Sequence, residues 1–493
     1  MQQAKSIIMV GSGAGVWTLA AWLAELMRPA NISLTVVELA EPSVLAEFSG
    51  SSLGRFNEII GLPEKQLIQS SNSTFSYGVC YEDWRTLGRN FMLSEAGVGD
   101  SYKGASFAGI FARARTLGLD VTYDSYSLAA SAALEGKFAH PPSSAQGIFS
   151  TLNYGLNLDV KGYAALLQVK AEAAGVVRIQ SNVTHLQRDA QRGYITQVQL
   201  QDGRQLACDL LLDCTLDGQL IRGQLKASES TNQALPVFNA ALVGARSLPQ
   251  LAAPYGRIKA TAAGIIRAIP LKERMIYHYS YTSNSASDAS VMDELAALDA
   301  ELIHALPNVG GNYVLSQFWE KNYIAMGAAA YQLPRLHQGF LPQLRNEVAR
   351  LGDLLMSFND LEILAQEYNR LTHLEYSERS ELSELQLYMA GNRIEPLKAF
   401  YAQQGLSEGA RHRYQLFASH GRLGVMNSSL MSEAERKALF LGNDILPAAR
   451  DPHLAALSDE ELLRFCRHVG QMTAMAVDKL PSHGEYLQRL MTL

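Results

Sequence analysis

The sequence predicts an α/β fold, and three observations support this prediction. The chain opens with a short apolar run at residues 6–10, a Gly-rich turn and an apolar stretch with helical spacing at 16–27, which is the order of a strand, a turn and a helix. A second apolar strand at 32–38 completes a βαβ unit, and a third run of this kind follows at 206–214, as is typical of buried parallel strands. From about Gln343 onward the pattern is mostly helical.

Composition excludes several classes of protein. The 493 residues are 47% hydrophobic and 18% charged, which is enough for a sizeable core and argues against disorder. The net charge is −6, so the chain lacks the excess of basic residues that is typical of nucleic-acid-binding proteins. The four Cys are scattered without a C-x-x-C pair, so neither a disulfide scaffold nor a zinc ribbon is expected. We find no apolar run of about 18 residues and no signal-peptide layout, and therefore expect a cytoplasmic protein without a membrane partner.

The middle and the end of the chain give further elements. A helix is expected at 161–174, and two alternating runs within 176–203 predict an antiparallel ribbon. The stretch 93–150 has no clear period. An amphipathic helix is expected at 458–480, with Ser458 and Glu461 as a capping box.

We expect two interleaved parts rather than sequential domains. Residues 1–90 and 150–345 are predicted to form an α/β part with a β-ribbon, which carries any cofactor. Residues 91–149 and 346–493 are predicted to form a mostly helical part on the substrate side.

The Gly-rich turn predicts a dinucleotide site. Gly11 and Gly13 fill the first two positions of the motif G-x-G-x-x-G, whereas Val16 stands at the third. Such a turn lets backbone N–H groups and a helix N-terminus approach a pyrophosphate. Glu38 ends the second strand, where an acid accepts the ribose hydroxyls. The alternative is a tight βα turn that holds no ligand.

The strand at 206–214 favours a flavin over a nicotinamide. It ends in Asp213, Cys214 and Thr215, directly after the predicted ribbon. Flavin disulfide-reductase and hydroxylase folds return to their cofactor domain in this way. The alternative is an ordinary buried strand with a terminal Asp.

Several long segments of the chain resemble one family. They are VGSGAGVW at 10–17, with Trp17 in place, and the segments 61–84, 202–215, 254–281, 319–339 and 479–489. These segments resemble the flavin-dependent tryptophan halogenase family, and the match covers nearly the whole chain. The resemblance implies an FAD-binding Rossmann-like fold of the GR2 type, shared by flavin monooxygenases and halogenases, with an added mostly helical substrate part.

The resemblance also implies a chemistry. In the family, reduced FAD and oxygen convert chloride to hypochlorous acid, which reaches the substrate through a tunnel. A Lys in an F-K pair and a Glu in P-L-E-S-T-G act beside the aromatic substrate, and two Trp of W-x-W-x-I-P line the tunnel region. The implied partners are a small-molecule or peptide aromatic substrate, a separate flavin reductase that reduces the FAD, and a second copy in a homodimer.

The chain departs from the family at each of these three motifs. Ser76 follows Phe75 at the position of the Lys. His337 stands at the position of the Glu, or Leu336 if the register slides by one. The segment 265–270 reads IIRAIP, so both Trp are missing. Ser cannot supply the positive charge of a Lys, and we expect altered chemistry.

Other residues near the matched segments are candidates for the cofactor site. The loop 47–50 lies where the family has Gly-Glu-Ala/Ser-Thr beside the flavin ring. Arg267 is a candidate to neutralise a carboxylate of the substrate or the reduced flavin, or is an ordinary salt-bridged Arg. The expected cofactor-binding residues are Gly11, Gly13, Ala14, Gly15, Glu38, Ser49, Asp213 and Gly339.

Three functions remain open on the sequence. The first is an FAD-dependent oxidoreductase that acts on an indole or another aromatic group and has lost Lys-dependent halogenation. The second is an authentic halogenase with an unusual active site. The third is a non-catalytic binding partner that keeps the FAD fold, which the loss of the third Gly to Val16 would favour.

Overall fold

The computed structural model divides the chain into two compact units, each assembled from three stretches of sequence. Unit 1 comprises residues 1–72, 158–241 and 304–380, and unit 2 comprises 73–157, 242–303 and 381–493. The structure describes residues 6–492 apart from 29–31, 41–43, 143, 145–146, 217–222, 224–228, 232–234, 237, 307–312, 338, 356–360, 426–430 and 450.

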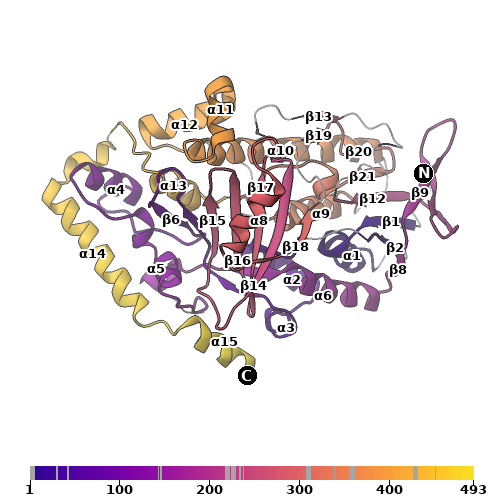
Figure 1. The fold of residues 1–493 in the computed structure, drawn as a ribbon, viewed down its shortest axis with the longest axis horizontal. Coiled ribbons are helices and arrows are strands. Elements are labelled where there is room, and N and C mark those ends of the chain that lie inside the picture. Colours follow the sequence, from indigo (N-terminus) through magenta and orange to yellow (C-terminus); the bar gives the residue numbers. More distant parts are fainter. Residues whose placement is uncertain are drawn as a thin grey trace. The chain divides into compact units, whose positions relative to one another are not determined.

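Unit 1 is built on a six-stranded, mostly parallel sheet of order β20-β21-β12-β1-β2-β8. Strands β1, β2, β8, β12 and β21 run parallel, and only β20 is antiparallel to its neighbour β21. Helix α1 packs against α6 and α9 (Figure 1). The strands of the sheet are β1 (Ser6–Gly11), β2 (Ser33–Glu38), β8 (Val177–Gln180), β12 (Leu210–Cys214), β20 (Trp319–Glu320) and β21 (Tyr323–Ala325).

The expected ribbon is present in unit 1, but its bounds differ from the prediction. The first alternating run is split between β8, which joins the parallel sheet, and β9, which pairs with β10. The run at 206–214 is likewise split between β11 of the ribbon and β12 of the sheet. The other elements of unit 1 are α1 (Gly13–Met27), β3 (Ala46–Ser49), α2 (Ser52–Ile59), α3 (Glu64–Ser70), α6 (Val160–Ala173), β9 (Val183–Arg188), β10 (Ile195–Leu200), β11 (Gln205–Ala207), β13 (Glu229–Thr231), β19 (Tyr313–Leu315), η4 (Gly327–Ala329), α9 (Leu341–Leu355) and most of α10 (Leu361–Ala390).

Unit 2 combines a second sheet with helices from the C-terminal third of the chain. Its strands β14, β17, β16, β15, β5 and β6 are neighbours in that order, and β15–β17 stand side by side in Figure 1. The strands of this sheet include β5 (Val79–Glu82), β6 (Asn90–Leu93), β14 (Ala240–Ser247), β15 (Gly256–Ala260), β16 (Gly264–Pro270) and β17 (Arg274–Tyr281). Strands β4 (Thr74–Ser76) and β7 (Gly155–Asp159) pair with each other in a separate sheet. The helices are α4 (Phe107–Thr116), α5 (Leu128–Leu134), α8 (Asp288–Ala296), α11 (Glu395–Gln404), α12 (Glu408–His420), α13 (Glu433–Gly442), α14 (Asp459–Val477) and α15 (His483–Thr492).

The units have other bounds than the two parts expected from the sequence. Residues 79–82 of β5 pair in parallel with 256–259 of β15, so both segments belong to unit 2 rather than to the cofactor part. Helix α9 belongs to unit 1, although the sequence places residues after 345 in the helical part. A helical pattern shows that a helix forms, but it does not show which sheet the helix covers.

The expected capping box at Ser458 is only half formed. The Ser458 side chain accepts the backbone N–H of Glu461, 3.2 Å away. The carboxylate of Glu461 instead accepts hydrogen bonds from Lys103 Nζ and the Tyr102 hydroxyl. A complete box occurs one helix earlier, between Ser432 and Glu435 at the start of α13.

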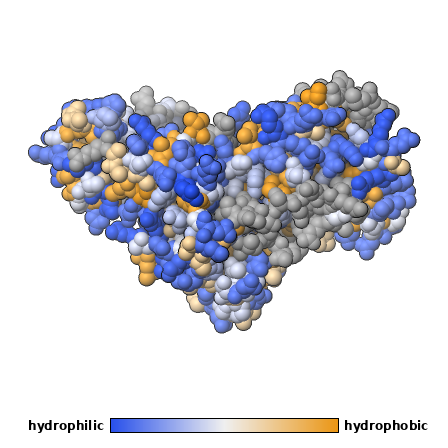
Figure 2. All heavy atoms as spheres, turned by 90° about the horizontal axis from the view of Figure 1, so that it is seen from above, coloured by the Kyte–Doolittle hydropathy of each residue, from blue (hydrophilic) through white to orange (hydrophobic). Residues whose placement is uncertain are grey.

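Three further features of the described residues concern the surface, the helices and the clusters of metal-binding side chains. Hydrophilic residues predominate on the face drawn in Figure 2, with hydrophobic ones scattered among them. In the described part of the chain, no helix is long and apolar enough to cross a membrane, and no cluster of three or more His, Cys, Asp or Glu is placed to hold a metal ion.

Candidate functional site

The end of β1 leaves no room for a side chain at Gly11. A Cβ atom at Gly11 would lie 2.8 Å from the carbonyl oxygen of Cys214 at the end of β12, so a side chain does not fit there. Gly13 begins α1 with a φ of +52°, a conformation that favours glycine. The sequence motif therefore marks a real steric requirement at both positions.

The N-terminus of α1 offers a cradle for an anion. Its N-cap residue Ser12 makes no capping hydrogen bond with its side chain, and its first turn contains no acid. The first N–H groups of a helix have no partner within the helix, and the helix dipole favours negative charge there. Ala14 and Gly15 line the adjacent cavity, and a Cβ at Gly15 would still lie 3.7 Å from the nearest atom.

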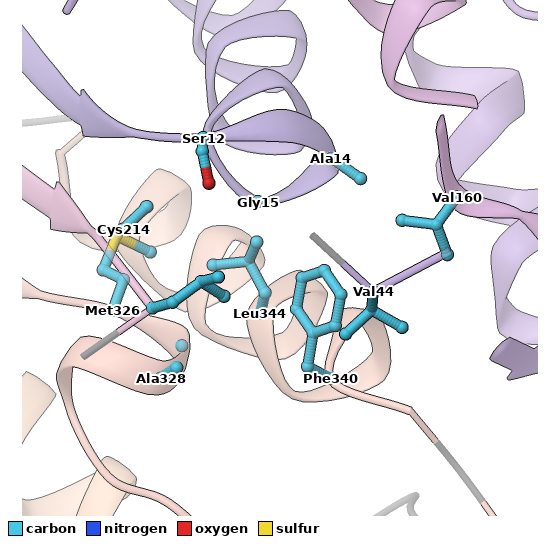
Figure 3. Close-up of a pocket in the computed structure, with 12 residues that line it drawn as sticks. Ser12, Ala14, Gly15, Val44, Val160, Cys214, Met326, Ala328, Phe340 and Leu344 are labelled. Atoms are coloured by element: carbon cyan, nitrogen blue, oxygen red, sulfur yellow. The ribbon is translucent and has the colours of Figure 1, made fainter. Parts of the chain in front are cut away.

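The pocket at this helix end is open to solvent, and the space outside the protein atoms within it is about 420 Å³ when that open solvent is included. Figure 3 shows Ser12, Cys214, Met326, Phe340 and Leu344 around it. Cys214 ends β12 and Leu344 lies on α9, whereas Ser12 and Phe340 directly precede α1 and α9, and Met326 directly follows β21. The full lining consists of Ser12, Ala14, Gly15, Val44, Val160, Cys214, Leu216, Met326, Gly327, Ala328, Phe340 and Leu344. The lining is mostly apolar and includes the first residues of α1.

Glu38 lies at the end of β2 with both carboxylate oxygens engaged. Its Oε1 accepts a hydrogen bond from the indole Nε1 of Trp17 over 2.8 Å, and its Oε2 accepts one from Arg178 Nε over 2.7 Å. The Glu38 side chain is 15% exposed. A carboxylate can accept about four hydrogen bonds, so the two engaged oxygens still have capacity for ribose hydroxyls.

Asp213 lies at the same edge of the sheet, because Val10 of β1 pairs in register with it. It is fully buried. Its Oδ1 accepts the N–H of Thr215, and its Oδ2 accepts the hydroxyl of Tyr323. In this structure Asp213 therefore organises the end of β12 from within the core.

Ser49 and Gly339 both lie beside α9. The buried Glu47 carboxylate accepts the backbone N–H groups of Phe340 and Leu341, and thus caps the helix. A Cβ at Gly339 would lie 1.9 Å from Glu47 Oε2. The Ser49 hydroxyl accepts a hydrogen bond from Arg345 Nη2.

A buried acid lies behind the cavity wall, and no sequence motif indicates it. Glu347 of α9 is fully buried, and its Oε2 accepts the N–H of Gly327, which lines the cavity. Burial raises the pKa of Glu347 to about 7, with the Gly327 N–H acting in the opposite direction. An Asn, Gln or Glu in an amphipathic helix normally faces water, so the sequence carries no signal for this position.

The two residues at the family's catalytic positions belong to different units. Ser76 ends β4 in unit 2, is fully buried, and exchanges two hydrogen bonds with the backbone of Gly78. The preceding Phe75 stacks on Phe138 with ring centroids 4.5 Å apart. His337 of unit 1 is 8% exposed, and Leu336 beside it is 4% exposed.

Arg267 lies in the segment that replaces W-x-W-x-I-P. It is on β16 with 4% exposure, directly opposite His278 on β17. Ile265 and Ile266 are also buried. The structure thus places a buried Arg where one family Trp is expected.

Comparison with known proteins identifies the family. The family model described as tryptophan halogenase matches residues 6–459. The chain belongs to the tryptophan halogenase family. Since this family is flavin-dependent, membership implies FAD.

The relatives of this halogenase-family chain are distant in sequence but close in fold. It is 25% identical to tryptophan 7-halogenase KtzQ of Kutzneria sp. over 400 residues, which cover 74% of this chain and 72% of that one. It superposes on a flavin-dependent halogenase from Xanthomonas campestris with a TM-score of 0.91 at 26% identity, covering 99% of both chains. A flavin-dependent halogenase from Brevundimonas sp. BAL3 gives a TM-score of 0.90 at 24% identity, again with 99% of both chains covered. The fold predicted from the sequence is confirmed.

Proposed function

We propose that the protein is an FAD-dependent oxidoreductase that uses reduced flavin and oxygen to modify an indole or another aromatic group, and that it has lost Lys-dependent halogenation. The observation that carries the proposal is Ser76 at the position of the family's Lys. A free small molecule or an aromatic side chain of a peptide is the substrate, and a separate flavin reductase supplies the reducing equivalents.

The surroundings of Ser76 support the loss. Its hydroxyl is within 3.3 Å of two backbone atoms of Gly78 and has no exposed surface. A hydroxyl in this arrangement carries no charge, and it is hydrogen-bonded to the backbone. It therefore cannot offer the cationic donor that the family's Lys presents to the oxidant.

Residues of unit 1 would hold the cofactor. The first turn of α1, with Gly13, Ala14 and Gly15, would bind the pyrophosphate, and Glu38 would accept the ribose hydroxyls. The apolar cavity walls would exclude water from the ring system. When bound and reduced, FAD supplies the reaction with oxygen; we assign this chain the tasks of orienting the ring and shielding it from water.

His337 is proposed to replace the family's Glu. A neutral imidazole can accept one proton and return it. Its neutral form cannot stabilise a positive charge on an indole as a carboxylate does. The change therefore fits a modified reaction better than an unchanged one.

A non-catalytic FAD-fold binding partner is the second candidate. It is favoured by one observation: Val16 stands where the motif G-x-G-x-x-G has its third Gly, and the loss of that Gly would weaken FAD binding. A flavin absorption band in the purified protein, or its appearance on adding FAD, separates the enzyme from this candidate. A second measurement separates oxygen insertion from the reaction of an authentic halogenase. It determines the masses of the products formed from indole compounds with reduced FAD, oxygen and bromide.

A further inference from the structure

A buried carboxylate fixes one wall of the proposed cofactor cavity. Glu347 Oε2 accepts the N–H of Gly327 over 2.5 Å, and Gln343 Nε2 donates to both the carbonyl of Gly327 and Oε1 of Glu347. Gly327 and Leu344, one helical turn before Glu347, both line the cavity. The position of the Gly327 turn therefore depends on the state of this carboxylate.

The neighbouring cations are already engaged by another acid. Arg350 Nη2 and Arg379 Nη2 lie 2.5 and 2.7 Å from the carboxylate of Glu375. Burial alone would raise the pKa of Glu375, but these two Arg residues hold it below its usual value. Glu375 is thus the permanently charged member of the cluster.

The remaining neighbours of Glu347 give it no positive charge. They are Cys214 of β12, Tyr331 after η4 and Tyr368 of α10. Burial raises the pKa of each well above its usual value, so all three are neutral at neutral pH. Arg350 favours the charged form of Glu347 only weakly, whereas burial and Glu375 disfavour it.

We infer that Glu347 takes up a proton when FAD binds, so that the cavity wall at Gly327 is coupled to the negative charge of the cofactor. The inference rests on the FAD site proposed above. A negative charge that enters the cavity disfavours a second one behind its wall. The proton comes from solvent, adds to one carboxylate oxygen, and converts Glu347 to the neutral acid without any change of oxidation state.

Calorimetric titration with oxidised FAD tests this directly. The heat of binding is measured at pH 7.5 in HEPES and in Tris, which have different ionisation enthalpies and therefore reveal protons taken up from the buffer; phosphate is avoided because it could itself bind at the N-terminus of α1. We expect the wild type to take up a fraction of a proton per FAD, and its Kd to rise with pH by less than tenfold per unit. Glu347→Gln keeps hydrogen-bonding atoms but cannot titrate, so it should bind FAD without the buffer dependence.

Glu362→Gln is the matched control. Glu362 is exposed in the first turn of α10, and this variant removes the same charge from unit 1. It should retain the proton uptake of the wild type. A wild type without buffer-dependent heat, or a Glu347→Gln variant with undiminished uptake, would overturn the inference while leaving the FAD site intact. Absence of FAD binding to the wild type would overturn the proposed function itself and the inference with it.

Discussion

The indole Nε1 of Trp17 donates a hydrogen bond to Oε1 of Glu38 over 2.8 Å. This contact joins the first helix of unit 1 to the end of its second strand, where the acid of a dinucleotide fold is expected. Arg178 of β8 holds the other oxygen. The orientation of Glu38 is therefore set before any ribose arrives.

Replacing Glu38 with Ala should weaken FAD binding. Hydrogen bonds to a charged group contribute about 1.5–3 kcal/mol, which corresponds to a Kd increase of roughly 10- to 150-fold. Trp17→Phe, which removes only the orienting donor, should have a smaller effect in the same direction. Fluorescence titration with FAD measures both, and Glu320→Ala, at an exposed acid on β20, is the control. Equal affinity of Glu38→Ala and wild type would remove Glu38 from the site.

Gly339→Ala should destabilise unit 1. The new Cβ would lie 1.9 Å from Glu47 Oε2, and Glu47 would have to release the N–H groups that it caps at α9. Loss of a helix cap costs about 1 kcal/mol, and displacing a buried carboxylate adds to that cost. Gly54→Ala is the control, because Gly54 lies within α2 with no atom within 4 Å of the new Cβ. Urea unfolding should show a loss for Gly339→Ala and no loss for Gly54→Ala; the same midpoint for both would refute the clash.

Glu347→Gln should stabilise the folded protein relative to wild type, and this gain in stability should be larger at pH 8 than at pH 5. The folded-state pKa of Glu347 is raised to about 7, so the wild type progressively loses stability as the pH rises from about 4.5 to 7. The neutral amide avoids this loss, which amounts to about 3 kcal/mol at most. Unfolding curves at pH 5 and pH 8 measure the difference between variant and wild type. A difference that does not grow with pH would show that Glu347 is charged throughout this range.

The sequence was informative where the chain makes its own local contacts. The sequence predicts the strands at 6–10 and 32–38 and the helix between them to within a few residues. It does so because the apolar runs and the Gly-rich turn are patterns of neighbouring residues. The run at 176–187 was assigned to one ribbon, although β8 belongs to the parallel sheet. Alternation of polar and apolar residues reveals a strand but not its partner.

The rest of the candidate site depends on contacts between distant segments. Glu461 was expected to close a capping box, but Lys103 binds its carboxylate across 358 positions of sequence. Glu347 meets Gly327, Glu375 and Cys214 only after four elements have packed together. Such clusters have no spacing in the chain that a sequence motif could express. The positions of Ser76 and His337 were found by resemblance, and their roles remain predictions.

Restoring the family's charges should restore part of the family's reaction. Ser76→Lys alone should give little halogenation, because His337 also stands in place of the Glu and such residues act as a unit. The double variant Ser76→Lys with His337→Glu should exceed either single variant. Ser76→Met is the matched control, since it adds a long side chain without a charge at a fully buried position. If Ser76→Met and Ser76→Lys behave alike in the double background, the charge is not what the site lacks.

Mass spectrometry of its products shows whether the natural protein has lost Lys-dependent halogenation. The unmodified protein is given reduced FAD, oxygen, chloride or bromide, and free tryptophan or other indoles. Loss of a group that acts in the transition state lowers the rate on the order of 10³-fold or more, so we predict no halogenated product above background. Robust halogenation by the unmodified protein would contradict this account and would mean that another group, such as His337, performs the role of the missing Lys.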